Sequence, residues 1–509
     1  MLLTHLLKES KIEFDIQGGL PSEDMEILDL VYDSRRAAAQ TAFICLTGSA
    51  SDGHHYAENA YRAGCRCFFV ERSLLLPDDA AVILCENTRA ALAALSSAFF
   101  GHPAGKLKII GVTGTKGKTT VTSLIYTVLN KAGFSCGVIG SNGIRFSGQY
   151  RPTLNTTPES YELQKTFRDM ADAGIRYVAM EVSSQALFTY RVDGIRFDIA
   201  VFTNLSEDHI GEGEHPDFSH YKRSKMSLFR QCRFAVMNAD DPAYKEFAAA
   251  CISPRLTYGI YQYADLSASA VHAYSLSNTL GISFHCKYQK NTFDCSLKMP
   301  GVFNVYNALA VIAVCTRIGV PPQTVSESLS DATVTGRFEI INALSYCTVV
   351  IDYAHNASSM KNLLDTARSY HPHRIICLFG SVGGRTRGRR RELSEIAADL
   401  ADFCILTSDN PNYENPADII SDMERYFDDT SCPHVSIPDR AEAIRYALHM
   451  AQSGDILLLC GKGHEDYQLI NGIKVPFSEK KIVLETAANL SRELHSIGET
   501  KSDITSLTR

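Results

Sequence analysis

The feature that most constrains the fold is the stretch Lys108-Ile-Ile-Gly-Val-Thr-Gly-Thr-Lys-Gly-Lys-Thr-Thr120. Its β-branched residues predict a buried strand, and apolar residues at helical spacing over 121–133 predict a helix that stops at a glycine. A strand, a glycine-rich loop and a helix together make a phosphate-binding loop, in which backbone N–H groups and the helix N-terminus surround phosphate oxygens. Lys118 would add a positive charge, and Thr119 could hold Mg²⁺. The stretch therefore predicts binding of a nucleoside triphosphate.

The glycines of this loop depart from the common phosphate-loop spacing. They lie at positions 111, 114 and 117, and Val112 stands where the common pattern has glycine. A plain glycine turn entering a helix is the alternative interpretation. We prefer the phosphate loop because Gly-Lys-Thr-Thr follows a predicted strand and begins a predicted helix.

The bulk properties describe a globular protein of several domains. At 509 residues the chain is too long for one core, and its 45% hydrophobic and 21% charged residues are ordinary. The net charge of −7 argues against nucleic acid as a partner. We expect no signal peptide and no membrane span. The 15 cysteines are scattered without CxxC spacing, which favours reduced thiols in a cytoplasmic protein over a zinc site.

The pattern of strands and helices predicts an α/β protein of three domains. Residues 1–104 form a small α/β domain, 105–335 a parallel-sheet ATPase domain around the phosphate loop, and 336–509 a doubly wound, Rossmann-like domain. The last of these has parallel-strand candidates over 348–351, 375–379, 403–407 and 456–460.

Polar side chains follow the predicted strands of the second and third domains. Glu181 ends the strand 177–180, and His209 follows the strand 199–203. Ligands of open parallel sheets bind outside the carboxyl ends of the strands, so both residues should lie near a metal-bound phosphate. Mg²⁺ needs only a few protein oxygens together with the nucleotide. Four similar clusters follow the strands of the third domain and predict a second binding surface.

These motifs resemble the Mur ligase family, and within it the members that add the third residue of the peptidoglycan stem peptide. The resemblance covers nearly the whole chain. It rests on eight motifs that follow one another along the chain. They are Asp33-Ser34-Arg35, the phosphate loop, Glu181-Val-Ser-Ser184, Thr203-Asn204-Leu205, Asp208-His209, Asn238-Ala-Asp-Asp241, Asp352-Tyr-Ala-His-Asn356 and Gly461-Lys-Gly-His-Glu465. It implies an ATP-dependent ligase that makes an acyl phosphate, which an amine then attacks to form an amide. Lys118, Mg²⁺ and loop N–H groups would stabilise the negative charge of both steps.

The resemblance also assigns roles to individual residues. Read by itself, Lys225 belongs to a solvated basic face, but it aligns with a lysine that CO₂ carbamylates to N6-carboxylysine, an anionic ligand of a second Mg²⁺ beside His209. The implied catalytic and metal residues are Lys118, Thr119, Glu181, His209 and Lys225. The implied ATP contacts are Gly114, Thr115, Lys116, Gly117, Lys118, Thr119, Thr120, Asn304, Arg337, His355 and Asn356. The implied contacts of the UDP-N-acetylmuramoyl-dipeptide are Tyr32, Ser34, Thr156, Thr157, Ser183, Thr189 and Arg191, although the family often has Gln where this chain has Thr189. The implied amino-acid contacts are Arg385, Asp409, Asn410, Pro411, Asn412, Gly461 and Glu465.

Asn412 decides which amino acid the sequence predicts. Members of the family that add meso-diaminopimelate carry Asp-Asn-Pro-Arg, whose arginine binds the distal carboxylate, whereas this chain has Asp409-Asn-Pro-Asn412. The sequence therefore favours L-lysine, with meso-diaminopimelate or another diamino acid as the alternative. An arginine of the run Arg385, Arg387, Arg389, Arg390 and Arg391 could replace the missing one.

Two other functions remain open. A folylpolyglutamate-synthetase-like ligase has the same core, but it has no use for a nucleotide-sugar module in front. A switch or transport ATPase would hydrolyse its nucleotide without an acceptor, and it has no role for Glu181, His209 and Lys225 together. The expected partners are therefore small molecules, and a monomer is expected.

Overall fold

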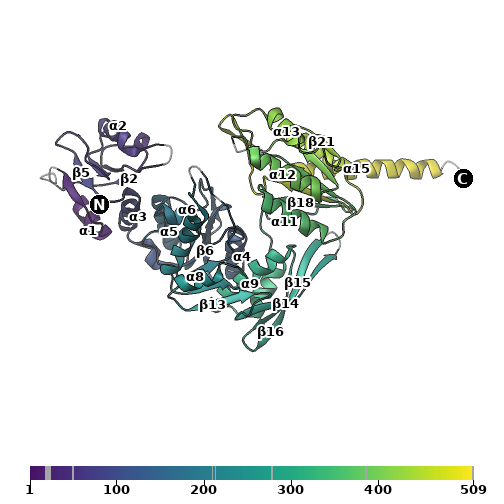
Figure 1. Cartoon of the computed structure of the whole chain (residues 1–509), viewed down its shortest axis with the longest axis horizontal. Coiled ribbons are helices and arrows are strands. Elements are labelled where there is room, and N and C mark those ends of the chain that lie inside the picture. Colours follow the sequence, from purple (N-terminus) through teal and green to yellow (C-terminus); the bar gives the residue numbers. More distant parts are fainter. Residues whose placement is uncertain are drawn as a thin grey trace. The chain divides into compact units, whose positions relative to one another are not determined.

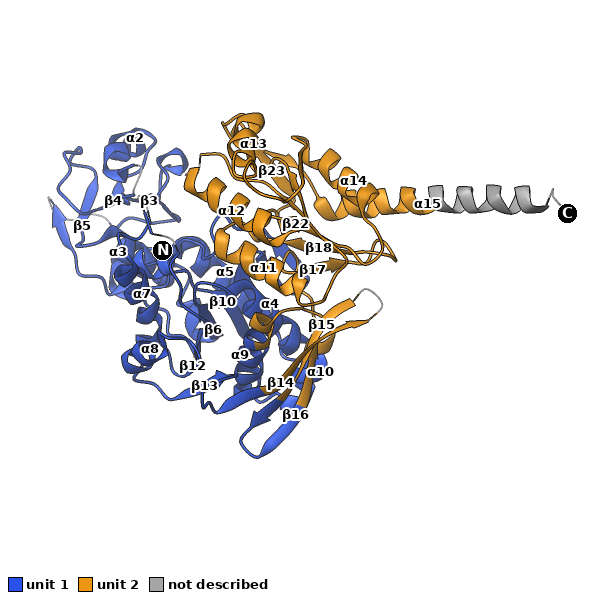
Figure 2. Cartoon of the chain, turned by 45° about the vertical axis from the view of Figure 1, so that its right-hand side comes forward, with its two compact units in different colours: residues 1–268, 286–293, 306–328 blue, residues 269–285, 294–305, 329–509 orange. Residues whose placement is uncertain are grey.

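The computed structural model describes residues 1–17, 24–48, 51–208, 210–211, 214–276, 279–384 and 387–506, with side chains to residue 492. The chain divides into two compact units (Figure 2). Unit 1 comprises Met1–Ala268, Cys286–Phe293 and Tyr306–Ser328, and unit 2 comprises Ser269–His285, Asp294–Val305 and Leu329–Arg509. Within the described residues, no helix combines the length and the apolar character that crossing a bilayer requires.

Unit 1 begins with a five-stranded sheet, of which β2 and β5 are labelled in Figure 1. The strand order is β1-β5-β4-β3-β2, and only β1 is antiparallel to its neighbour. Successive residues of its strands point to opposite faces, so that Phe68 and Val70 enter one apolar cluster while Cys67 and Phe69 enter another. Burial on both faces explains the uninterrupted apolar strands. The elements are α1 (Leu3–Ser10), β1 (Asp15–Gln17), β2 (Asp29–Val31), η1 (Ser34–Arg36), β3 (Thr41–Ile44), η2 (Gly53–Tyr56), α2 (Ala57–Arg62), β4 (Cys67–Val70), β5 (Ala81–Leu84), α3 (Thr88–Phe99) and η3 (Pro103–Lys106).

The phosphate loop follows β6 in the middle of an eleven-stranded sheet, ordered β16-β15-β14-β13-β12-β11-β6-β10-β7-β8-β9. The strands β10 and β11 are parallel to β6 on its two sides, and Glu181 pairs in register with Val112. Two neighbouring strand ends therefore lie beside the loop. The elements are β6 (Lys108–Thr113), α4 (Lys118–Lys131), β7 (Cys136–Gly140), β8 (Gly143–Phe146), β9 (Gln149–Arg151), α5 (Ser160–Asp172), β10 (Tyr177–Glu181), α6 (Ser184–Phe188), β11 (Ile199–Phe202), α7 (Phe218–Met226), η4 (Ser227–Arg230), β12 (Ala235–Asn238), α8 (Tyr244–Ala250), β13 (Arg255–Gly259), β14 (Leu266–Leu276), β15 (Thr279–Tyr288), β16 (Asn291–Leu297), α9 (Val302–Ile318) and α10 (Pro322–Ser330).

Unit 2 contains a six-stranded sheet in the order β17-β18-β22-β19-β20-β21, parallel except for β17. The chain runs outward from β18 to β19, β20 and β21 and then returns to place β22 between β18 and β19, which makes a switch point where ligands of such sheets bind. The elements are β17 (Glu339–Ile341), β18 (Thr348–Asp352), α11 (Ala357–Arg368), β19 (Ile375–Phe379), α12 (Arg387–Leu400), β20 (Phe403–Leu406), α13 (Pro416–Glu424), β21 (His434–Ser436), α14 (Arg440–Met450), β22 (Ile456–Cys460), the hairpin β23 (Tyr467–Ile470) and β24 (Ile473–Pro476), and α15 (Glu479–Ser506).

The α/β fold class and the strand-loop-helix context of the phosphate loop are confirmed. The four predicted strands of the last sheet correspond to β18, β19, β20 and β22. The hairpin β23–β24 and the short strands β17 and β21 escaped prediction. All fifteen cysteines belong to the described residues, and each is free and buried, as expected for reduced thiols. The domain boundaries near residues 104 and 335 stay predictions.

Candidate active site

The phosphate loop has a backbone shape that only glycine tolerates at two positions. Gly114 (φ +148°) and Gly117 (φ +87°) have positive φ, and a Cβ atom would collide with Thr203 Oγ1 at the first and lie 2.6 Å from Asn307 Oδ1 at the second. The backbone N–H of Thr115 donates to the carbonyl of Asn204 at 2.9 Å, and that of Lys116 donates to the side-chain oxygen of Asn204, also at 2.9 Å. The loop is thus fixed by the residues that follow β11.

Lys118 and Thr119 begin α4, whose N-terminal backbone N–H groups face the loop. Lys118 Nζ donates to the carbonyl oxygens of Gly114 at 2.8 Å and Thr115 at 3.0 Å. The hydroxyl of Thr119 donates to Glu181 Oε2 at 3.0 Å. A cation, a hydroxyl and a carboxylate therefore meet at one loop, as nucleotide chemistry requires.

Glu181 is buried at the carboxyl end of β10, with 1% of its surface exposed. Its Oε1 atom accepts a hydrogen bond from the backbone N–H of Ser141 at 2.8 Å, while Oε2 faces Thr119. The hydroxyl and carboxylate oxygens are the hard ligands that Mg²⁺ prefers, so this pair fits the metal that the sequence predicts. His209 lies outside the described residues. Its neighbour Asp208 forms an ion pair with Lys116 at 3.1 Å.

Lys225 is buried against the phosphate loop and not on a solvated face. Its side chain reaches from α7 to the carbonyl oxygen of Gly114, to which Nζ donates at 2.9 Å, and its residue is 1% exposed. Nζ lies 4.5 Å from the centre of the Tyr221 ring. Burial, followed by the charge of Lys118, lowers the pKa of Lys225 well below its ordinary value. Burial at this position therefore favours the neutral form of the amine over the charged form.

Several residues that the sequence predicts to contact the UDP-N-acetylmuramoyl-dipeptide lie around the strand end that carries Glu181. The Thr157 hydroxyl donates to the carbonyl of Glu181 at 2.9 Å and accepts from the backbone N–H of Ser183 at 3.1 Å. Arg191 forms an ion pair with Glu159 at 2.8 Å, and its Nη1 donates to the carbonyl of Thr157 at 3.1 Å. These contacts form one polar cluster next to the phosphate loop.

The other residues predicted to contact the UDP-N-acetylmuramoyl-dipeptide do not all lie in this cluster. The Thr156 hydroxyl lies 3.0 Å from that of Ser141, close to Glu181. The Tyr32 hydroxyl donates to Glu162 Oε1 at 2.9 Å, and Ser34 begins η1. The hydroxyl of Thr189 donates to the carbonyl of Gln185 within its own helical turn at 2.8 Å, so its side chain is already engaged.

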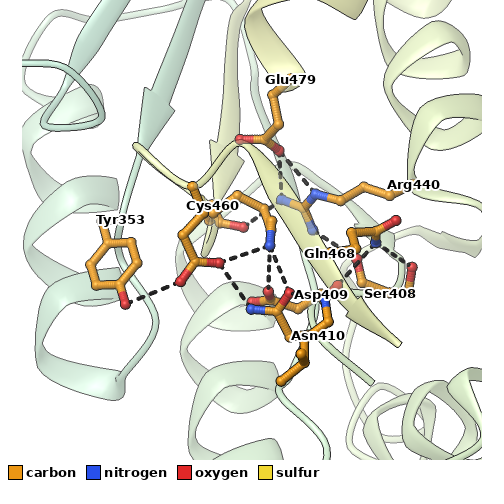
Figure 3. A network of polar contacts seen from close by, with 11 residues as sticks. Tyr353, Ser408, Asp409, Asn410, Arg440, Cys460, Gln468 and Glu479 are labelled. Atoms are coloured by element: carbon orange, nitrogen blue, oxygen red, sulfur yellow. Dashed lines mark hydrogen bonds and ion pairs between the residues drawn. The ribbon is translucent and has the colours of Figure 1, made fainter. Parts of the chain in front are cut away.

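In unit 2, the predicted amino-acid residues meet at the ends of β20 and β22. Asp409 and Asn410 follow β20 and lie together in a dense polar network (Figure 3). Lys462 Nζ donates to Asn410 Oδ1 and to Glu465 Oε2, both at 2.8 Å, and lies 3.8 Å from Asp409 Oδ1. Burial raises the pKa of Asp409, while the positive charges of Arg440 and Lys462 oppose that rise. Asp409 Oδ1 has no hydrogen-bond partner among the described residues.

Arg440 links the same two strand ends through Ser408, which follows β20, and Cys460, the last residue of β22 (Figure 3). Its guanidinium donates to Glu479 Oε1 at 2.8 and 2.9 Å, to the carbonyl of Ser408 at 3.1 Å and to that of Cys460 at 2.7 Å. Neither Arg440 nor Glu479 has appreciable exposure. This fully buried ion pair fixes the loops that carry the predicted amino-acid contacts.

Asn412 holds the hairpin β23–β24 and has a left-handed backbone (φ +53°). Its N–H donates to the carbonyl of Leu469 at 2.8 Å, its carbonyl accepts from Asn471 at 2.7 Å, and its side-chain oxygen accepts from the N–H of Gly472 at 3.0 Å. Asparagine tolerates this conformation better than most residues do. The Asn412 side chain, on which the prediction of the amino acid depends, therefore has a structural role in the hairpin. Pro411 precedes it in the same loop.

The arginine run after β19 is largely engaged in ion pairs. Arg390 is buried between Glu414 and Asp422, at 2.6 and 2.8 Å. Arg387 also approaches Asp422, at 3.6 Å, and Arg391 pairs with Glu395 one turn along α12 at 2.7 Å. Arg385 lies outside the described residues.

Arg389 differs from these neighbours because it makes no ion pair with any described residue. It is half-buried in the first turn of α12. The loop before α12 contacts the amino-acid loop, since the N–H of Gly383 donates to the carbonyl of Asn410 at 2.9 Å. The charge of Arg389 is also among those that oppose the raised pKa of Asp409. Arg389 is thus a cation close to the network, and none of the described carboxylates forms an ion pair with it.

The remaining predicted ATP contacts belong to unit 2. Asn304 Nδ2 donates to the carbonyl of Pro300 at 2.7 Å, and the Arg337 guanidinium lies 5.0 Å from the centre of the Tyr353 ring. His355 Nδ1 lies 2.8 Å from the carbonyl of Tyr353, and Asn356 caps the N-terminus of α11. Gly461 follows β22 and donates its N–H to the carbonyl of Asp352 at 3.1 Å. Arg337, His355, Asn356 and Gly461 therefore lie at the carboxyl end of the unit 2 sheet.

Sequence reasoning missed three residues that organise these sites. Tyr221 is fully buried, and its hydroxyl lies 3.0 Å from that of Thr115 in the phosphate loop. Lys462 lies inside a recognised motif, but its role depends on contacts across the fold. Arg440 belongs to no motif, and only its place at the start of a helix would have pointed to the site.

Comparison with known proteins gives consistent matches over the chain. The Mur ligase middle domain family matches residues 112–315, and the family described as Mur ligase, glutamate ligase domain matches residues 336–463. The UDP-N-acetylmuramoyl-L-alanyl-D-glutamate–2,6-diaminopimelate ligase of Caldanaerobacter subterraneus is 41% identical over 489 residues, which are 96% of this chain and 99% of that protein. The ligase of the same name from Geobacillus kaustophilus is 39% identical over 475 residues, covering 91% and 95%. A solved structure of a ligase with this name has a TM-score of 0.68 at 29% identity and covers 96% of this chain and 100% of its own.

Proposed function

Because the chain belongs to the Mur ligase family, whose members are ATP-dependent amide ligases, we propose that it adds meso-diaminopimelate to UDP-N-acetylmuramoyl-L-alanyl-D-glutamate in peptidoglycan synthesis. The observation that carries this proposal is the likeness over nearly the full length to relatives named for that reaction. The L-lysine preference inferred from Asn412 has no support from these relatives. The contacts of Asn412 weaken it further, because its side-chain oxygen serves the hairpin.

The phosphate loop would bind ATP and stabilise the charge that develops during phosphoryl transfer. Mur ligases use ATP together with Mg²⁺, and Thr119, Glu181 and His209 are the residues that would hold the metal here. When bound, Mg²⁺ would neutralise the charge of the phosphate oxygens. The positively charged ammonium group of Lys118 would stabilise the negative charge of the transferred phosphoryl group. The N–H groups of the loop would bind the oxygens of that phosphoryl group. The acceptor carboxylate would then be positioned by the cluster around Thr157, Ser183 and Arg191.

We also propose that Lys225 reacts with CO₂ to form N6-carboxylysine. The neutral amine would attack the carbon of CO₂ and release a proton to solvent, which leaves a carbamate anion. Its burial and lowered pKa supply the neutral amine that this reaction needs. A carbamate oxygen would suit a second Mg²⁺ together with His209. The anion would also relieve the crowding of positive charge near Lys118.

The network of unit 2 would bind the incoming amino acid. Three carboxylates, the buried Asp409 and Glu479 and the partly exposed Glu465, share the two cations Lys462 and Arg440. The excess negative charge favours an ammonium group, and the distal ammonium is the suitable one because the reacting amine must lose its proton. Reduced thiols support a cytoplasmic location, where ATP and nucleotide-linked substrates are found.

The proposal is tested by phosphate release from ATP in the presence of the UDP-linked dipeptide. We expect release with meso-diaminopimelate to exceed release with L-lysine or L-ornithine by at least about tenfold in kcat/KM, and none without an amino acid. Release with lysine alone would restore the original argument from Asn412. Release with no amino acid tested would contradict the proposed reaction.

Arg389 gives the proposed substrate a binding partner for its second carboxylate. Among the described arginines of the run it is the one without an ion pair, and L-lysine has no second carboxylate that could bind to it. Arg389→Gln should therefore raise KM for meso-diaminopimelate about 10- to 100-fold, the usual effect of losing a hydrogen bond between charged groups, and leave any weak use of L-lysine unchanged.

The control for Arg389 is Arg391→Gln, because Arg391 lies on the same helix but is already paired with Glu395. Steady-state kinetics with both amino acids would compare the two variants. An equal effect of both substitutions, or a loss that includes L-lysine, would show that Arg389 does not bind the second carboxylate.

A further inference from the structure

The two carboxylate oxygens of Glu465 have different surroundings. Oε2 accepts from Lys462 Nζ at 2.8 Å and from Asn410 Nδ2 at 2.9 Å. Oε1 has a long contact of 3.5 Å with the Tyr353 hydroxyl. A carboxylate oxygen can accept two hydrogen bonds readily, so Oε2 is satisfied within the protein while Oε1 keeps capacity for another donor. The side chain therefore has a fixed end and an available end.

Lys462 also determines the orientation of Asn410. An ammonium group only donates hydrogen bonds, so the atom that faces it at 2.8 Å must be the amide oxygen. The backbone N–H of Leu469 donates to the same oxygen at 2.9 Å. The amide nitrogen then has to face Glu465, where it gives the second hydrogen bond to Oε2. Reversing the amide would place donors against donors.

Arg440, the other cation of the network, cannot replace Lys462. Arg440 is committed to Glu479 and to the carbonyls of Ser408 and Cys460. Lys462 has no exposed side-chain surface, so water would not easily take its place. Without it, Asp409 and Glu465 would face each other with one cation fewer, and Glu465 would be free to turn.

We propose that Lys462 is a positioning residue for amino-acid recognition, because it holds Glu465 and Asn410 so that Glu465 Oε1 stays available to the ammonium group of the incoming amino acid. Lys462 does not touch the substrate and acts through Glu465. This inference rests on the proposed function, in which the unit 2 network binds the amino acid.

The test is a double-mutant cycle with Lys462→Met and Glu465→Gln. KM for meso-diaminopimelate is measured at saturating ATP and UDP-linked dipeptide. We expect Lys462→Met and Glu465→Gln each to raise this KM about 10- to 100-fold, and the double variant to lie within about threefold of Glu465→Gln. Multiplied effects of the two substitutions would mean that Lys462 acts independently of Glu465 and would overturn the proposal.

Two measurements separate positioning from loss of structure. The acyl phosphate can be trapped with hydroxylamine in the absence of amino acid, and Lys462→Met should keep this reaction within about twofold of wild type. Lys361→Met is the matched lysine control, because Lys361 pairs with Asp365 on the outside of α11. If Lys462→Met loses the trapping reaction, the double-mutant cycle with Glu465→Gln is repeated with Lys462→Gln, whose side-chain amide group can still donate hydrogen bonds. A wild-type protein that forms the acyl phosphate but uses no amino acid would contradict the proposed function before any variant is compared.

Discussion

Lys118→Ala is expected to lower ATP turnover by about a thousandfold while the protein stays folded. Its ammonium group lies over the phosphate loop and contacts the carbonyls of Gly114 and Thr115, so its removal leaves partly hydrated backbone oxygens and no cavity in the core. Catalysis suffers because the loop loses the point charge that stabilises the transferred phosphoryl group. The measurement is phosphate release with both acceptor substrates, together with thermal unfolding of each protein.

Lys131→Ala is the matched control, because Lys131 ends the same helix and donates to the carbonyl of Ser328 at 3.2 Å. We expect it to leave turnover within about twofold. Direct titration with ADP would separate weaker nucleotide binding from slower chemistry. Full turnover in Lys118→Ala would refute the assignment of the phosphate loop.

The phosphate loop and its strand neighbours could be predicted because their signals are local. All of these signals lie within one short segment of the chain. The β-branched run before Gly111 forms β6, the glycines form the loop after it, and the helical pattern from Val121 belongs to α4. The place of Glu181 at the end of β10 could be predicted because the carboxyl ends of neighbouring parallel strands meet at one edge of the sheet. Local pattern and sheet topology therefore carried this part of the prediction.

Burial and long-range pairing could not be predicted in the same way. Lys225 belongs to a helix rich in lysine and arginine, which by pattern alone is a solvated face, yet its amine is enclosed by Gly114 and Tyr221. The structure corrects that interpretation, while the carbamate that the resemblance implies stays a prediction. Asn412 shows the opposite error, since its residue type was compared with the family while its partners, Leu469 and Gly472, were unknown.

The network of unit 2 illustrates why motifs alone do not define a site. Gly461-Lys-Gly-His-Glu465 names Lys462 and Glu465 together, but the function of the lysine depends on Asn410, more than fifty residues earlier. Arg440 and Glu479 belong to no motif and support both strand ends. Residues that meet only through the fold have no signal in a single sequence.

Lys225→Ala is expected to lower ligation by at least about a hundredfold and to be partly rescued by acetate or formate. The substitution removes the group that we propose to become a carbamate, and a small carboxylate in the space left behind would restore an anionic oxygen near the loop. Rescue is measured as phosphate release and amide formation against carboxylate concentration, with chloride at the same ionic strength as the control. Undiminished activity would remove the carbamate proposal.

The state of the unmodified amine is tested by the pH dependence of stability in CO₂-free buffer without Mg²⁺. Because burial lowers the pKa of Lys225, the unfolded chain binds a proton more tightly at this group than the folded protein does, so the free energy of unfolding contributed by this group rises with pH. It does so up to the ordinary lysine pKa of about 10.4. Lys225→Met removes this contribution, so its advantage over wild type should be larger at pH 7 than at pH 9.5. An advantage that does not change with pH would mean that the buried amine keeps its proton, and the neutral nucleophile needed for reaction with CO₂ would then be missing.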